Sequence, residues 1–216
     1  MSAPFVITVG RQFGSGGREL GRLIADRLGI EFFDKKLLLQ AARKSGVLPE
    51  IYEHKDERMP SILTGGLSFA MGMMGGTSPW AGPTSISDEN MQAAIADVIR
   101  ELARTRSCVI VGRTADYVLR DNPHVTNIFV HAPEEECIRR IIGRGDKTTE
   151  AEARSMCRKI NKLRASYYNF YTDRRWGHSS TYHLTVDSSS MPLPQIADMI
   201  CGYVRHRADA AAIRTD

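Results

Sequence analysis

The chain has 216 residues, of which 42% are apolar and 25% are charged, a composition typical of one globular α/β domain with a small appendage. Its formal net charge is only +4 and no run of five or more Lys or Arg residues occurs, which argues against a nucleic-acid-binding surface and suits a small phosphorylated ligand. The N-terminus has neither a basic leader nor a long apolar stretch, so we expect no signal peptide and a cytoplasmic location.

The first part of the chain alternates short apolar runs with helical patterns. PFVITVG at residues 4–10 predicts a buried strand that ends in a glycine turn. Apolar residues at helical spacing follow over residues 16–29, and IEFFD at residues 30–34 predicts a second strand. Residues 35–46 predict another helix, which residues 49–58 are able to extend toward Pro60.

A long uncharged segment comes next. Residues 61–87 hold no charged side chain and are long enough to span a bilayer, but their glycines and prolines disfavour a helix. We therefore expect a flexible insertion at residues 59–87, on the acceptor side of the site, and no membrane partner. Met71, Met73 and Met74 are suited to packing on a ligand or on a second subunit, which would make the protein a homodimer.

The second part of the chain repeats the alternation. A helix over residues 88–104 is expected to begin near Ser87, whose hydroxyl would cap it. The other predicted elements are strands at 107–112, 126–132 and 182–188, and helices at 133–145, 149–171 and 192–207. The cysteines at 108, 137, 157 and 201 form no Cys-x-x-Cys pair, so we expect reduced thiols in the core.

Five strands alternating with helices predict an α/β fold with a mainly parallel sheet, formed by residues 1–216 as a single domain. Ligands of such sheets bind beyond the carboxyl ends of the strands. That edge would bring together residues 10–18, Asp34, Gly112, Arg113 and His131, of which His131 reads as a structural histidine.

The segment VGRQFGSGGREL at residues 9–20 is similar to a phosphate-binding loop, whose pattern is G-x-x-x-x-G-K-[ST]. Its glycines crowd together as the loop requires. However, Gly17, followed by Arg18, stands where the lysine belongs, and Glu19 comes next, where a hydroxyl would bind Mg²⁺. Successive backbone N–H groups at a helix N-terminus bind anions without a lysine. The alternative is a tight strand-to-helix turn that holds no ligand.

Four stretches carry a wider resemblance: ITVGRQFGSGGRELGRLIADRLGIEFFDKKLL, SCVIVGRTADYVLRD, IFVHAPEEECIRRI, and YYNFYTDRRWG together with YHLTVDSS. They resemble the cytidylate kinase-like family of bacterial proteins, within the P-loop nucleoside monophosphate kinases, over nearly the whole chain outside the Gly/Met-rich segment. The resemblance implies a P-loop NTPase-type three-layer sandwich with a five-stranded sheet and a helical lid at residues 145–178. It implies Mg²⁺-dependent transfer of the γ-phosphoryl group of ATP to a nucleoside monophosphate such as CMP.

On the donor side the resemblance implies that ATP is bound by Gly14, Ser15, Gly16, Gly17, Arg18 and Glu19. Arg18, one place after the missing lysine, would reach the phosphates, and Glu19 would hold Mg²⁺ directly or through water. Asp34 would lie near the metal and the transferred phosphate, as a catalytic and substrate-binding residue. An equal alternative makes Asp34 the N-cap of the next helix.

On the acceptor side VIVGRT aligns with a kinase stretch that reads Asp-Gly-Arg-Asp. Arg113 matches and would hold the acceptor phosphate, because a guanidinium fork fits phosphate oxygens. The two aspartates fall on Val111 and Thr114, of which Thr114 would still be able to hydrogen-bond a base. Asp116 is near enough to substitute for the lost aspartate, although a solvated or capping role is the simpler interpretation.

The basic stretch before the last strand would be the lid. Its Arg158 and Arg164 would close over the donor phosphates and neutralise charge in the transition state. The family pattern Asp-x-x-Arg reads Asn161 to Arg164 here. The alternative is the polar face of an amphipathic helix, and the aromatic run at residues 166–171 reads as packing between lid and core.

The departures from the family pattern leave two other functions open. Losses at Gly17, Gln40, Val111 and Asn161 favour a non-catalytic nucleotide-binding or regulatory protein. The altered acceptor side and the uncharged segment at 61–87 favour a kinase of a non-nucleotide small molecule.

Overall fold

The computed structural model describes residues 4–44 and 84–213, and its centre is a five-stranded sheet. The strand order is β2-β3-β1-β4-β5, and every neighbouring pair is parallel. The α/β fold with a parallel five-stranded sheet is therefore confirmed. The strands are β1 (Val6–Arg11), β2 (Glu31–Phe33), β3 (Cys108–Val111), β4 (Val125–His131) and β5 (Leu184–Asp187).

Helices connect the strands, as a parallel sheet requires. The first, α1, ends where Gly29 takes the left-handed conformation, at φ 63°, and its N–H returns to the carbonyls of the last turn. The helices are α1 (Gly17–Leu28), α2 (Lys35–Lys44), α5 (Thr84–Thr105), α6 (Ala115–Val118), α7 (Glu134–Gly143), α8 (Glu150–Thr172) and α9 (Leu193–Ile213), with a 3₁₀ turn, η2, at Ser179–Thr181.

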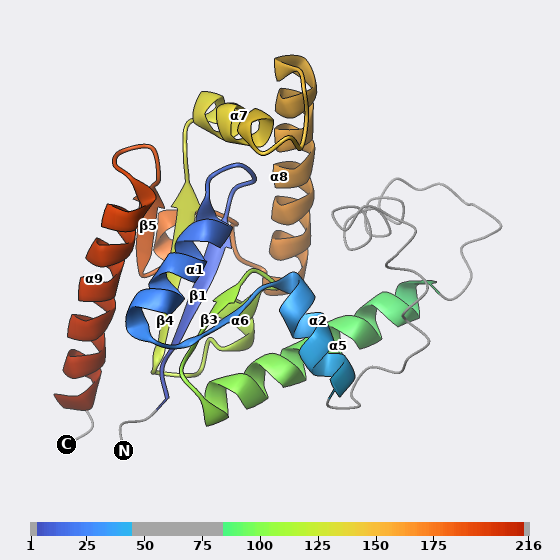
Figure 1. The fold of residues 1–216 in the computed structure, drawn as a ribbon. Helices are drawn as coiled ribbons and strands as arrows, with labels where there is room; N and C mark the ends of the chain where they lie inside the picture. Colours follow the sequence, from blue (N-terminus) through green and yellow to red (C-terminus); the bar gives the residue numbers. More distant parts are fainter. Residues whose placement is uncertain (1–3, 45–83, 214–216) are drawn as a thin grey trace.

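Side-chain alternation along the strands creates two apolar faces. Val6 and Ile110 point to the face covered by α2 and α5, whereas Ile7 and Val109 point to the face covered by α1 and α9. Figure 1 shows the two helical layers on opposite sides of the sheet. This arrangement confirms the three-layer sandwich.

A third apolar cluster joins α7 and α8 to the loop that follows β1, where Phe13 packs against it. The helix α8 is continuous over 23 residues, as the basic stretch at 149–171 predicts. Its N-cap is Thr149, whose hydroxyl accepts a hydrogen bond from the Glu152 N–H at 3.3 Å. The Gly14 loop, α7 and α8 thus form one packed unit beyond the sheet, visible at the top of Figure 1.

Some elements differ from the sequence prediction. The helix α5 already begins at Thr84, and α9 runs to Ile213, beyond its predicted end. The short elements α6 and η2 were not predicted. Three predictions lie outside the described part of the structure. They are the cap by the Ser87 side chain, the helix at 49–58, and the insertion at 59–87 as far as residue 83.

The four cysteines are free and buried, as expected. Within 4–44 and 84–213, no helix combines the length and the apolar character needed to cross a bilayer.

Candidate active site

The loop between β1 and α1 has the tight geometry of a phosphate-binding loop. Gly14 and Gly16 take left-handed conformations, at φ 81° and 75°. A Cβ on Gly14 would lie 2.6 Å from the carbonyl oxygen of Cys137, so the loop is pressed against α7. Gly16 is the N-cap of α1, which directs the first N–H groups and the positive end of the helix dipole into the loop.

Side chains around the loop fix its backbone. The Ser15 hydroxyl is buried and donates to the Gln12 carbonyl at 2.9 Å, while Ser188 donates to the Ser15 carbonyl at 2.6 Å. The Phe13 N–H donates to Oδ1 of Asn161 at 2.7 Å. Asn161, which counts as a loss against the family pattern, therefore holds the loop from α8.

The structure brings Arg18 and Asp34 together. Arg18 Nε and Nη2 donate to Oδ2 of Asp34 at 2.8 and 2.7 Å, and Oδ1 of Asp34 accepts the Leu37 N–H at 3.1 Å. Burial alone would raise the pKa of Asp34, but the Leu37 N–H and Arg18 outweigh it and the pKa is lowered. The capping role offered as an alternative for Asp34 is thus present, in addition to the ion pair.

The metal prediction centres on Glu19, which lies exposed in the first turn of α1 beside the loop. Among the described residues, no three His, Cys, Asp or Glu side chains are grouped to hold a metal ion. Mg²⁺ in kinases takes only one or two protein carboxylates and completes its shell with phosphate oxygens and waters. Glu19, beside the loop, would supply one such carboxylate, while Asp34 is already paired with Arg18.

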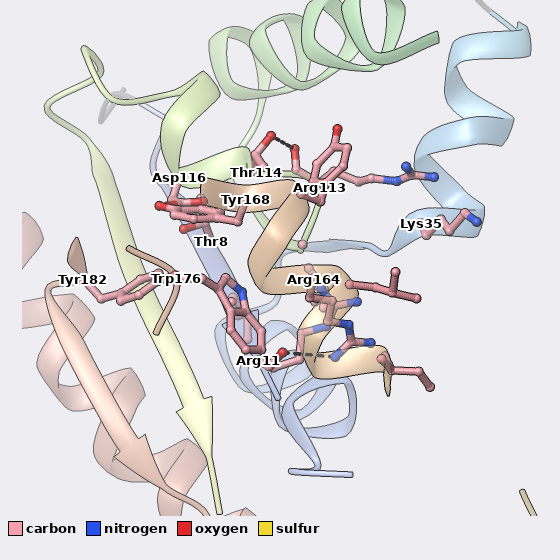
Figure 2. A pocket seen from close by; sticks show the side chains of 17 residues that line it. Thr8, Arg11, Lys35, Arg113, Thr114, Asp116, Arg164, Tyr168, Trp176 and Tyr182 are labelled. Carbon is pink, nitrogen blue, oxygen red and sulfur yellow. Dashed lines mark hydrogen bonds between the residues drawn. The ribbon is translucent and has the colours of Figure 1, made fainter. Parts of the chain in front are cut away.

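A cavity of about 300 Å³ opens beside the loop, and its two sides carry different kinds of side chain. Figure 2 shows cationic side chains on one side of it, from β1, α2, the β3–α6 turn and α8. They are Arg11, Lys35, Arg113 and Arg164. The predicted residues Arg113 and Arg164 therefore meet in one cavity, whereas Arg18, Asp34, Glu19 and Arg158 do not line it.

Arg11 is a site residue to which the sequence prediction gave no role, although it lies within residues 10–18 of the expected binding edge. It ends β1, and its pKa is lowered because its guanidinium is buried and lies near Arg164 and Arg113, with Asp34 acting in the opposite direction. Arg164 Nη1 donates to the Arg11 carbonyl at 3.0 Å. Burial lowers the pKa of Arg164 to about 10. Two crowded guanidinium groups are the arrangement expected where a polyanion binds.

The other predicted lid arginine is engaged elsewhere. Arg158 Nε and Nη2 donate to the two carboxylate oxygens of Glu134 on α7, at 2.8 and 2.9 Å, and Arg154 donates to the same carboxylate at 2.9 Å. These contacts lower the pKa of Glu134 to about 2, chiefly through the hydrogen bond from Arg158. Arg158 here joins α8 to α7, and its role in catalysis stays a prediction.

The turn after β3 holds its residues in an unusual conformation. Gly112, Arg113 and Thr114 all have positive φ, at 79°, 60° and 51°. The Thr114 hydroxyl donates to the Arg113 carbonyl at 2.6 Å. Left-handed non-glycine residues concentrate at functional sites, and this turn directs Arg113 along the cavity wall toward Lys35 (Figure 2).

The opposite side of the cavity is aromatic and carries one buried carboxyl group. Asp116 is only 7% exposed and accepts a hydrogen bond from the Tyr168 hydroxyl. Burial raises the pKa of Asp116, and burial also raises the pKa of Tyr168. Trp176 and Tyr182 line the same side (Figure 2). Asp116 is therefore buried and not solvated, and its capping contacts with its own N–H group and that of the next residue are present in addition to the hydrogen bond from Tyr168. The run at 166–171 contributes to the cavity as well as to packing.

Comparison with known proteins points to one family. The model of the cytidylate kinase-like family matches residues 6–190. No protein with a curated description matches the sequence.

Solved structures share the fold. An uncharacterized protein from Eubacterium ventriosum ATCC 27560 is 26% identical, with a TM-score of 0.69 over 93% of this chain and 98% of that chain. A gluconokinase from Sinorhizobium meliloti 1021 is 17% identical, with a TM-score of 0.54 over the whole of both chains. A shikimate kinase from Acinetobacter baumannii, in complex with shikimate, is 16% identical, with a TM-score of 0.51 over 94% of each chain.

Proposed function

Because the chain belongs to the cytidylate kinase-like family, we propose that it transfers the γ-phosphoryl group of ATP to a nucleoside monophosphate. Its family and fold are those of small-molecule kinases, and the class of acceptor is inferred from the cavity.

One observation carries the proposed acceptor class: the cavity beside the phosphate-binding loop has opposite chemistries on its two sides. The cations Arg113 and Arg164 suit a phosphate, whereas aromatic rings and the buried Asp116 suit a flat heterocycle with an N–H donor. A volume of about 300 Å³ is at the small end for ligand pockets and suits one mononucleotide. A nucleoside monophosphate presents both chemistries in one molecule.

The reaction needs positioning and charge neutralisation rather than covalent catalysis. An oxygen of the acceptor phosphate forms a bond to the γ-phosphorus while the bond from that phosphorus to the β,γ-bridging oxygen breaks, and ADP leaves. The N–H groups of the loop at 14–18 hold the donor phosphates, and Arg113 holds the acceptor phosphate. Mg²⁺, held by Glu19 or Asp34 with the phosphates, would neutralise donor charge.

A nucleotide-binding protein without turnover is the second candidate, favoured by two ion pairs. Arg18 and Asp34 are paired with each other and Arg158 is paired with Glu134, so three of the four predicted catalytic residues are engaged in ion pairs. Such a protein would bind ATP and release no ADP.

The test is ADP release with Mg²⁺ and ATP against a panel of ribo- and deoxynucleoside monophosphates and of phosphate-free polyols and hydroxy acids. We expect release to depend on a nucleoside monophosphate. Arg113→Ala should raise the KM for that acceptor about 10- to 100-fold and leave the KM for ATP nearly unchanged. Arg104→Ala, which removes an exposed arginine at the far end of α5, is the matched control.

Each outcome has a distinct meaning. Turnover with a phosphate-free acceptor alone would identify a kinase of another small molecule. ATP binding without any turnover would identify the non-catalytic alternative.

A further inference from the structure

The phosphate-binding loop lacks the lysine of its general pattern, yet a cation occupies the corresponding space. In G-x-x-x-x-G-K the lysine follows the first glycine by six positions. With the lysine position at Gly17, the first glycine falls on Arg11. Relative to the pattern, the chain has thus exchanged a glycine and a cation between these two positions.

The structure shows that the two positions share one space. A Cβ on Gly17 would lie 2.6 Å from Cβ and 3.1 Å from Cγ of Arg11. The aliphatic part of Arg11 therefore lies over the first residue of α1, where a side chain from residue 17 would begin. Arg11 and a lysine at position 17 cannot both fit without displacement.

The guanidinium of Arg11 extends to the boundary between the loop and the cavity. A Cβ on Gly112, at the end of β3, would lie 2.0 Å from Nη1 of Arg11. Arg11 also lines the cavity that contains Arg113 and Arg164 (Figure 2). Its charged end thus lies between the N–H groups of the loop and the arginines of the acceptor side.

The charges around Arg11 favour an anionic ligand. Arg164, Arg113 and Arg18 all act on it as like charges, and Asp34 is the one opposing charge that acts appreciably on it among the described residues. Asp34 is itself paired with Arg18. Within 4–44 and 84–213, no hydrogen bond from the Arg11 guanidinium to a protein acceptor is found, while its own carbonyl is held by Arg164.

We propose that Arg11 supplies, from β1, the cation that binds the terminal phosphates of ATP in place of the lysine of the general loop pattern. The proposal rests on the function proposed above and adds a residue to it. It assigns to Arg11 the role that the sequence predicts for Arg18, whose side chain is 65% exposed and paired with Asp34. A Cβ at Gly17 or at Gly112 would collide with the side chain of Arg11, which passes over both positions.

The first experiment measures the binding of single nucleotides without Mg²⁺, by calorimetry, with ATP and AMP each added alone as a probe. Arg11→Ala should weaken ATP binding about tenfold or more and leave AMP binding nearly unchanged, because AMP lacks the β- and γ-phosphates. Arg11→Lys should lose less than Arg11→Ala, and Arg104→Ala should bind both probes as the wild type does. Thermal unfolding of each variant verifies that it is folded.

The second experiment returns the cation to position 17. Gly17→Lys alone should weaken ATP binding, because the lysine collides with Arg11. Arg11→Gly combined with Gly17→Lys should bind ATP more tightly than Arg11→Gly alone, since glycine also removes the Cβ that a residue-17 side chain would meet at 2.6 Å, and the lysine then enters the vacated space. The substitution Gly17→Lys would thus weaken ATP binding when Arg11 is present and strengthen it when Arg11 is absent. This reversal is not expected if Arg11 has a merely structural role.

Three results would overturn the proposal: ATP binding by Arg11→Ala equal to that of the wild type, an equal loss for ATP and AMP, or no gain from the lysine in the double variant. Failure of the proposed function is separate. It would appear as wild-type protein that binds ATP but transfers no phosphoryl group, and the binding comparison would still decide the role of Arg11.

Discussion

Single side chains decide what each side of the cavity accepts, and Asp116 is the clearest case. It is a carboxyl group enclosed by aromatic rings, with the Tyr168 hydroxyl as its hydrogen-bond donor. Burial disfavours its charged form, which is why its pKa is raised. This makes Asp116 sensitive to pH and gives it two hydrogen-bonding roles, as acceptor when ionised and as donor when protonated.

Asp116→Asn should remove a pH-dependent cost of folding. Because the folded-state pKa of Asp116 is raised, its contribution to stability is complete below the unfolded pKa of about 3.9 and is lost as the pH rises through the folded pKa. Asparagine does not titrate and still accepts from Tyr168. At pH 7 the variant should have a free energy of unfolding about 1 kcal/mol higher than the wild type. Urea unfolding should show this difference shrinking toward pH 4, and a constant difference would contradict the prediction.

Gly14→Ala should damage the loop by collision and not only by backbone strain. Gly14 and Gly29 both have positive φ, but a Cβ on Gly14 would meet Cys137 at 2.6 Å whereas a Cβ on Gly29 would meet nothing within 4 Å. Gly29→Ala should lower the free energy of unfolding by about 1 kcal/mol. Gly14→Ala should lower it by about 2 kcal/mol or more and should also abolish ATP binding. Denaturant unfolding of the matched pair tests this, and equal costs would refute it.

The sequence identified some site residues and not others for physical reasons. Arg113 and Arg164 follow from the family resemblance, through its Gly-Arg and Asp-x-x-Arg motifs, and both line the cavity. Arg11 was expected at the ligand-binding edge, within residues 10–18, but was given no role, because that role depends on the space left by Gly17. The missing side chain at Gly17 was the available signal, but only the fold shows which residue fills that space.

The helix α2 follows directly after Asp34, where a cap and an ion pair meet. Oδ1 accepts the Leu37 N–H and Oδ2 accepts from Arg18. The strand β2 and the helix α2 thus share a junction that is tied to the first turn of α1. Sequence alone left the cap and the substrate role of Asp34 as alternatives, because one-dimensional patterns do not show that Arg18 reaches it.

Asp34→Ala and Asp34→Asn should separate the cap from the ion pair. Asparagine keeps an acceptor for the Leu37 N–H, so Asp34→Asn should lose only the pair with the exposed Arg18, about 0.2–1 kcal/mol. Asp34→Ala should lose about 1–2 kcal/mol, because the cap is removed as well. The wild-type contribution should be present above pH 3.9 and disappear as the pH falls through the lowered pKa. Urea unfolding that finds both variants equal would contradict this division.

Most elements could be located from periodicity and turn residues alone. Short apolar runs such as residues 107–112 became buried strands, and helical spacing in residues 16–29 became α1. The small element α6 was missed because four residues contain too little periodicity to detect. Strand order was not predicted either, since the placement of β1 between β3 and β4 depends on long-range packing.

The molecule as a whole carries clustered positive charge at one cavity, so polyanions should stabilise the fold. A ligand that binds only the native state at 100 times its Kd adds about 2.7 kcal/mol, which raises the melting temperature of a protein of this size by about 5–10 °C. ATP and inorganic tripolyphosphate should both produce such a shift in thermal unfolding. Sodium chloride at equal ionic strength should not, and an equal shift with chloride would indicate general screening instead of a site.

The continuous helix α8 has a consequence for how the two ligands influence each other. Asn161 holds the loop through the Phe13 N–H, Arg164 holds the Arg11 carbonyl, and Tyr168 donates to Asp116. These residues follow one face of the helix over about 10 Å. A small rotation of α8 on donor binding would therefore be transmitted to the acceptor side. Thermodynamic reciprocity then requires that acceptor binding change the affinity for the donor by the same factor.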